Sequence, residues 1–190
     1  NSVALGDAGN HQVSFNPSNL YLFLLVSFVT FLPYQIHYIP RAAALLKQYP
    51  AVWFLILAGL LFYLYTYSNS HPYNAKEASF FYRNVVLHHT LSKIWLKFLV
   101  FIPMLSAVFT YYFFWKDSQP QHKILLLLIY IFGLFTYVPL PMVEPRYYLT
   151  ALAFIIAVKP AISTKLDLAC LAINIPCACL MVFCISKFWG

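Results

Sequence analysis

Hydrophobic and polar positions alternate in long blocks along this chain, with six apolar stretches between residues 20 and 189 and nearly all charges in the gaps. A hydrocarbon core about 30 Å thick requires about 20 residues of α-helix. Five stretches approach or reach that length, so we expect membrane-spanning helices near residues 21–39, 51–67, 94–115, 124–138 and 168–185. The pattern predicts an all-α, multi-pass transmembrane bundle, with residues 1–190 as a single transmembrane domain.

The sixth stretch, residues 147–158, is too short to cross a membrane by itself. Its twelve residues span about 18 Å as a helix, so we expect the preceding segment, 140–146, to enter the membrane before the helix begins. Non-helical backbone is tolerated at that depth only against protein or a water-filled cavity. Glu144 and Arg146 are therefore predicted to line such a cavity; the alternative is an ordinary interfacial loop with an ion pair.

Composition and charge narrow the class further. Hydrophobic residues make up 62% of the chain and charged residues 9%, against roughly 25% charged in soluble domains, which excludes a water-soluble fold. If all six stretches cross, the short Lys- and Arg-containing loops 40–50, 116–123 and 159–167 share one side, and the positive-inside rule predicts that this side is cytoplasmic. The net charge of +7 then anchors the protein at membrane surfaces, and the sequence has no basic stripe typical of nucleic-acid binding.

Proline residues mark the expected helix boundaries. Most fall at or near a predicted helix end, where they interrupt no helical hydrogen bond. Three lie inside apolar stretches, and we expect each of them to kink its helix. The boundary prolines are Pro40, Pro50, Pro72, Pro120, Pro139, Pro141, Pro145 and Pro160, and the internal ones are Pro33, Pro103 and Pro176.

Three polar clusters fall on the same side of the membrane under this topology. Arginine forms forked hydrogen bonds with phosphate, and carboxylates suit sugar hydroxyls, so their convergence indicates recognition of an anionic, polar ligand at the interface. The alternative for the first cluster is a plain turn. No metal- or cofactor-binding motif is present, and we expect neither a metal nor a cofactor. The candidate binding residues are Asp7, His11, His71, Arg83, Glu144 and Arg146.

The same clusters carry a family resemblance. In chain order they read Gly6-Asp7-Ala8-Gly9-Asn10-His11, then His71-Pro72-Tyr73 with Phe80-Phe81-Tyr82-Arg83, then Pro141-Met142-Val143-Glu144-Pro145-Arg146-Tyr147. Together these motifs resemble those of the dolichyl-phosphate-glucose α-1,2-glucosyltransferases of the endoplasmic reticulum. In that family the central loop usually contains an Asp-Asn-Arg-His core, whereas residues 74–79 here are shorter and lack it.

The resemblance implies a GT-C-like enzyme of the endoplasmic reticulum membrane. Its reaction would move glucose from dolichyl-phosphate-glucose onto a lipid-linked oligosaccharide in an α-1,2 linkage, the terminal glucosylation of the N-glycan precursor. Such an inverting transfer needs a base at the acceptor hydroxyl and stabilisation of the leaving phosphate. Arg146 or Arg83 would bind the phosphate, and Glu144 would orient Arg146 rather than act as the base, because a neighbouring Arg lowers the pKa of a carboxylate.

We expect the chain, which begins at Asn1, to be the C-terminal part of a longer protein. The resemblance implies that the acidic first lumenal loop of the family belongs to the preceding part, so the catalytic base is left unassigned here. Two alternatives stay open. One is a transporter or channel-like protein in which Glu144 and Arg146 line a permeation path, and the other is an inactive fragment of the transferase.

Overall fold

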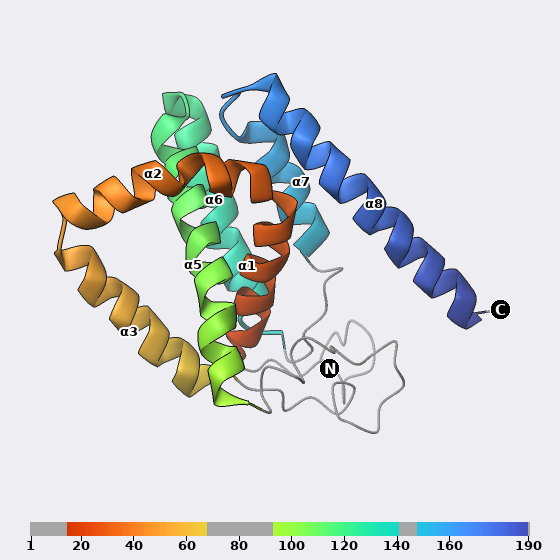
Figure 1. Ribbon diagram of the computed structural model, residues 1–190, viewed down its shortest axis with the longest axis horizontal. Helices are drawn as coiled ribbons and strands as arrows, with labels where there is room; N and C mark the ends of the chain where they lie inside the picture. The colour runs from red at the N-terminus through yellow and green to blue at the C-terminus, as the bar shows by residue number, and fades with distance from the viewer. Residues whose placement is uncertain (1–14, 68–92, 141–147, 190) are drawn as a thin grey trace, which may run out of the picture.

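The computed structural model describes residues 15–67, 93–140 and 148–189. All regular structure within these residues is helical, which confirms the all-α prediction for this part of the chain (Figure 1). The helices are α1 (Ser18–Thr30), α2 (Leu32–Gln48), α3 (Ala51–Thr66), α5 (Ile94–Asp117), α6 (Pro120–Tyr137), α7 (Leu149–Val158) and α8 (Thr164–Trp189).

The first expected span, residues 21–39, is wrong as a single helix. The chain breaks at Phe31, and α1 and α2 meet at a bend of 97°. Pro33 lies in the first turn of α2, where its missing N–H and its fixed φ suit a helix start and end the preceding helix. Pro40, which we expected at a boundary, lies inside α2 instead.

Several other expected boundaries are confirmed within the described residues, whereas those at Pro72, Pro141 and Pro145 lie outside them. Pro50 immediately precedes α3, and Pro120 is the first residue of α6. Pro103 and Pro176 lie inside α5 and α8, as expected. The short sixth stretch becomes α7, whose ten residues span about 15 Å.

Two of the described helices are long and apolar enough to cross a membrane. They are α5, with 24 residues, and α6, with 18; the bent pair α1–α2 would make a third crossing if it is counted as one span. Helices α3 and α7 are apolar but shorter. The structure therefore supports a helical membrane protein, while the full set of six crossings stays a prediction.

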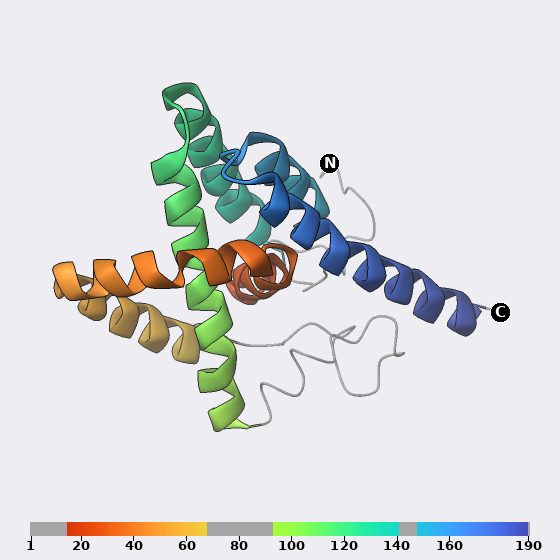
Figure 2. The same cartoon turned by 45° about the horizontal axis from the view of Figure 1, so that its top comes forward.

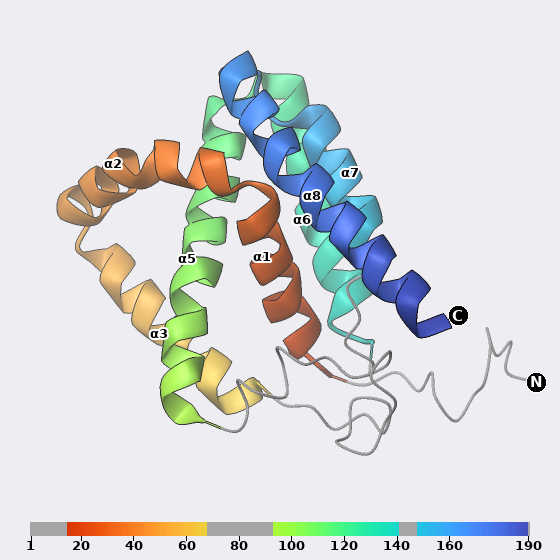
Figure 3. The same cartoon turned by 45° about the vertical axis from the view of Figure 1, so that its right-hand side comes forward.

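Aromatic packing around α1 holds the bundle together. α1 lies between α5, α6 and α8 (Figures 1 and 3) and packs most extensively against α5. Phe23 stacks on Tyr111 with 5.9 Å between ring centroids, and Phe31 meets the edge of Phe114 at 5.3 Å. Each such pair contributes about 0.5–1.5 kcal/mol beyond burial. Because Tyr111 also hydrogen-bonds Ser27, the position of α1 along α5 is fixed, and with it the two ends of the bundle.

Candidate functional site

The six candidate binding residues all lie outside the described residues. Asp7 and His11 belong to residues 1–14, His71 and Arg83 to 68–92, and Glu144 and Arg146 to 141–147. Their convergence therefore stays a prediction. The structure does define the residues that border these three segments.

The segment 141–147 is bordered by two residues that meet the side chain of Asn19 in the first turn of α1. The Asn19 amide nitrogen donates a hydrogen bond of 2.8 Å to the carbonyl oxygen of Leu140. The amide oxygen of the same side chain accepts a hydrogen bond of 2.8 Å from the Tyr148 hydroxyl. Leu140 precedes the segment and Tyr148 follows it, so Asn19 ties both borders to the start of α1.

The backbone adds a further link at the same place. The N–H of Asn16 donates a hydrogen bond of 2.8 Å to the carbonyl oxygen of Val138. Only Phe15 separates Asn16 from the first segment, residues 1–14. The side chain of Asn16 is buried and accepts a hydrogen bond from the N–H of Ser18 at 3.2 Å. The residues that follow the first segment therefore contact the residues that precede the third segment.

The borders of the second segment, 68–92, reach the same end of the bundle. At the end of α3, the Thr66 hydroxyl hydrogen-bonds the hydroxyl of Tyr21, three residues from Ser18 at the start of α1. The Tyr67 ring lies 5.8 Å from the Tyr21 ring between centroids. Lys97, in the first turn of α5, places its ammonium 5.8 Å from the centre of the Tyr67 ring. The end of α3 and the start of α5 therefore both lie beside the start of α1.

All three segments that hold the candidate residues are thus bordered at one end of the bundle, the end at which α1 begins (Figure 1). Convergence of the polar clusters on one side of the membrane requires this arrangement. We call the hydrogen-bonded group of Asn16, Asn19, Leu140 and Tyr148 the Asn19 junction.

Ion pairs stabilise the opposite end of the bundle, where α5 ends. The Arg41 guanidinium on α2 donates two hydrogen bonds, of 2.5 and 2.8 Å, to the carboxylate of Asp117 at the end of α5. The Tyr38 hydroxyl donates a third to Asp117 at 3.2 Å. The guanidinium also lies 4.5 Å from the centre of the Phe113 ring. This end therefore holds α2 across α5.

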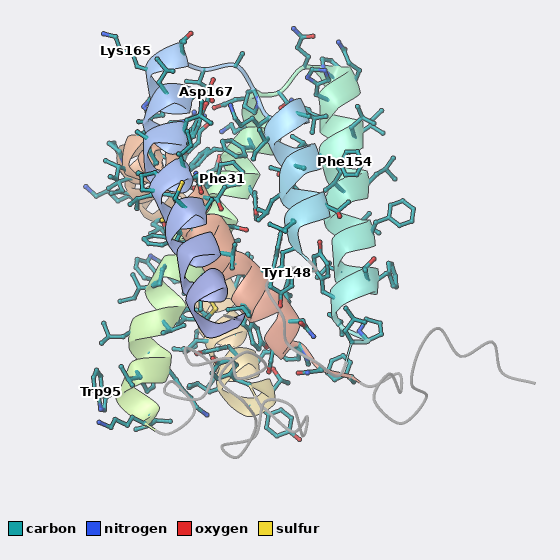
Figure 4. All side chains as sticks on the ribbon, turned by 90° about the vertical axis from the view of Figure 1, so that its right-hand side faces the viewer. Phe31, Trp95, Tyr148, Phe154, Lys165 and Asp167 are labelled. Carbon is teal, nitrogen blue, oxygen red and sulfur yellow. The ribbon has the colours of Figure 1, made fainter. Side chains whose placement is uncertain are left out.

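A second ion pair at this end joins Lys159, directly after α7, to Asp167 in the first turn of α8, and Tyr34 of α2 hydrogen-bonds both residues. The Lys159 ammonium pairs with Asp167 and donates a hydrogen bond of 2.8 Å to the Tyr34 hydroxyl, which donates one of 2.6 Å to Asp167. Burial raises the pKa of Asp167, but the hydrogen bonds from Lys159 and Tyr34 outweigh burial, so its pKa lies below the usual value. Figure 4 shows Asp167 at the end of the bundle away from Trp95.

The carbonyl oxygen of Thr30, freed where α1 ends, accepts a hydrogen bond of 2.9 Å from the Asn174 side chain of α8. A helix C-terminus leaves such carbonyls without intrahelical partners. Asn174 supplies the missing donor and fixes α8 against the break between α1 and α2. Together with the ion pair of Asp167, it gives α8 two polar attachments to the body.

Asn19 was not among the residues predicted from the sequence, although the signal was present. Asn19 ends a polar run directly before an apolar stretch, where a buried polar group needs partners inside the protein. Asp117 and Asp167 were not among the candidate residues either, although they are acids in otherwise basic loops. Among the described residues, no group of three or more His, Cys, Asp or Glu could hold a metal ion.

Comparison with known proteins completes this description. No curated protein and no solved structure matches the chain. The sequence model of the DIE2/ALG10 family matches residues 1–157. This is the dolichyl-phosphate-glucose α-1,2-glucosyltransferase family, whose members are membrane-embedded glycosyltransferases of N-glycan precursor assembly that use lipid-linked sugar donors and acceptors. Because the match covers most of the chain and includes all three polar clusters, the chain belongs to the DIE2/ALG10 family.

Proposed function

We propose that this chain is part of an enzyme of the endoplasmic reticulum membrane that transfers glucose from dolichyl-phosphate-glucose to a lipid-linked oligosaccharide. The new bond is an α-1,2 linkage, made in the terminal glucosylation of the N-glycan precursor. The observation that carries this proposal is the family match over residues 1–157, which includes every candidate binding residue. The common location of the segment borders at one end of the bundle supports it.

The physical setting favours such a reaction. Both substrates carry long prenyl tails, so an enzyme embedded in the bilayer meets their phosphates and sugars at the interface. Helices α5 and α6 have the length and apolarity for this setting. The Asn19 junction would place the segment 141–147 beside the N-terminal segment, where a single ligand could contact both.

In the proposed reaction the acceptor hydroxyl oxygen attacks the anomeric carbon of glucose, and the bond to the dolichyl phosphate breaks. The leaving group is dolichyl phosphate, and the hydroxyl proton passes to a base, which we do not assign to a residue of this chain. Arg146 or Arg83 would stabilise the leaving phosphate through forked hydrogen bonds, and Glu144 would hold Arg146 in position. Asp7, His11 and His71 would contact sugar hydroxyls.

A transporter is the alternative from another class. Many transporters use two broken helices in corresponding halves of the fold. The described part of the chain contains one bent pair, α1–α2, and its bend lies at the end away from the Asn19 junction. No observation therefore favours the transporter over the transferase.

The test is complementation with the complete protein that contains this chain, in cells without their own terminal glucosyltransferase. Lipid-linked oligosaccharides are extracted, and the fraction that carries the last glucose is measured by mass spectrometry. We expect the wild type to restore it, Arg146→Ala to reduce the rate at least about 100-fold, as loss of a charge-stabilising group does, and Arg146→Lys to recover part of the rate. The control is Lys165→Ala, an exposed lysine at the opposite end. Failure of the wild type to add glucose, or full activity of Arg146→Ala, would contradict the proposal.

A further inference from the structure

Helices α2 and α3 form an elbow that projects from the bundle on the side opposite α8 (Figures 1 and 2). α3 reaches the body at its C-terminal end, where Tyr63 packs against Tyr21 and Phe101 with ring centroids 4.9 and 5.8 Å apart. Between this contact and the elbow lies a hollow of about 650 Å³, lined by residues of α1, α2, α3 and α5. We call it the elbow hollow.

The walls of the elbow hollow are apolar over most of their length. The α3 residues that line it recur every three or four positions, which places them on one face of the helix. Open space lies beside this face, because a Cβ added at Gly59 would meet nothing within 4 Å. The lining residues of α3 are Val52, Leu55, Ile56, Gly59, Phe62 and Tyr63, and those of α5 include Phe101, Met104, Leu105 and Val108.

Polar residues line the elbow hollow at one end. Gln48 is the last residue of α2, Tyr49 follows it, and Lys116 comes from the last turn of α5. We call this polar end the mouth of the elbow hollow. Lys116 adjoins Asp117, the partner of Arg41, so the mouth lies at the end of the bundle opposite the Asn19 junction. An amphipathic helix bent across the bundle axis, such as α2, is typical of the membrane interface. We therefore expect the mouth to lie at the depth of lipid headgroups.

Charge at this end favours an anionic occupant. The two described carboxylates, Asp117 and Asp167, are already paired with Arg41 and Lys159. Within the described residues, this leaves a surplus of lysines that form no ion pair, although Lys116 is close enough to Asp117 to help lower the pKa of its carboxyl. They are Lys47, Lys116, Lys123 and Lys165.

We propose that the elbow hollow is a binding site for an anionic phospholipid, with an acyl chain along the inner face of α3 and the phosphate beside Lys116 and Gln48. The apolar walls match the chain, and the cationic mouth matches the headgroup of an anionic lipid of the cytoplasmic leaflet. The site is separate from the proposed transfer reaction, because the glucose donor must present its phosphate at the Asn19 junction end.

The test uses the complete protein in nanodiscs of phosphatidylcholine that contain a small fraction of phosphatidylserine with a photoreactive group on one acyl chain. After irradiation, mass spectrometry maps the crosslinked peptides. We expect crosslinks on the inner face of α3, between Val52 and Phe62, and on the facing residues of α5. Lys116→Gln should lower their yield about fivefold, the effect of one lysine near an anionic headgroup. The matched control is Lys93→Gln, an exposed lysine at the start of α5.

A second variant tests the apolar part of the site without changing charge. Gly59→Leu places a side chain in the empty space and favours the helix, so the protein should fold while crosslinking from the α3 face is lost. Its control is Gly133→Ala, in a different apolar hollow lined by α1, α5, α6 and α7. The added Cβ meets the Tyr137 ring at an ordinary contact distance of 3.4 Å, so the yield should stay unchanged. Equal yields from photoreactive phosphatidylserine and phosphatidylcholine would show bulk lipid only and overturn the proposal. Absence of lipid crosslinks from α3, as when another protein segment fills the hollow, would overturn it as well.

Discussion

The hydroxyl of Tyr148 donates a hydrogen bond of 2.8 Å to the side-chain oxygen of Asn19, and both side chains are completely buried at 0% exposure. Because the same Asn19 amide donates to Leu140, one side chain holds both borders of the segment 141–147. A buried polar group left without a partner costs about 1–3 kcal/mol. The junction is therefore stable only when all three residues keep these positions, which places both borders of the segment beside the start of α1.

Asn19→Ala should destabilise the protein and impair transfer together. The substitution removes two hydrogen bonds and leaves the Leu140 carbonyl and the Tyr148 hydroxyl without this partner. We expect a loss of about 1–2 kcal/mol in the free energy of unfolding in detergent micelles. Gln119→Ala, at an exposed glutamine of the opposite end, serves as the control and should change neither quantity. Wild-type stability in Asn19→Ala would show that the junction does not hold the segment.

The pair of Arg41 and Asp117 should contribute modestly, because the two side chains are 40% and 24% exposed. A double-mutant cycle with Arg41→Ala and Asp117→Ala should give a coupling energy of about 0.5–1 kcal/mol. Screening should reduce this coupling at high salt. The measurement is the free energy of unfolding of the four proteins at low and high ionic strength. A coupling near zero at low salt would mean that this ion pair does not help to hold α2 across α5.

The contribution of Asp167 should depend on pH. Its pKa is lowered in the folded protein, so the stabilisation is fully present above the usual carboxyl value of about 3.9. It is lost as the pH falls through the lower folded value. Asp167→Asn should therefore be less stable than the wild type at pH 7, and the difference should shrink on acidification below about pH 4. Thermal unfolding across this range measures the effect.

Tyr34→Phe provides the matched comparison. It removes the hydroxyl between Lys159 and Asp167 but keeps their direct ion pair. We expect a smaller loss than for Asp167→Asn and no change in the direction of the pH dependence. Equal losses in the two variants would indicate that the hydroxyl rather than the ion pair stabilises this end.

Hydrophobic periodicity predicted most helices well because span length and proline position are local properties. Pro50 and Pro120 mark helix starts in the structure as they do in the sequence. The break at Phe31 was not predicted, because an apolar stretch that contains Pro33 is compatible with a kinked span as well as with two helices. Tertiary contacts decide between them. Here Tyr34 and Tyr38 pack on Phe114 and Phe113 with ring centroids 5.2 and 4.8 Å apart, which holds α2 across α5.

Contacts between residues far apart in sequence could not be predicted either, because they also depend on tertiary structure. Nothing local in the sequence pairs Asn19 with Tyr148, or Arg41 with Asp117. The polar clusters themselves were recognised from residue type and order, and the family match over residues 1–157 confirmed the family to which they pointed. Their joint position is a three-dimensional property, and it is the central claim of the proposed function.

Crosslinking between the first and third segments tests that claim most directly. In the complete protein with its native cysteines replaced by serine, cysteines are introduced by His11→Cys and Arg146→Cys, and a short bifunctional thiol reagent is added. The control pairs His11→Cys with Gln121→Cys, at the exposed start of α6 on the opposite end. We expect the first pair to crosslink efficiently and the control pair to give no product. Crosslinking of the control pair instead of the first would contradict a shared binding site for the donor phosphate and sugar.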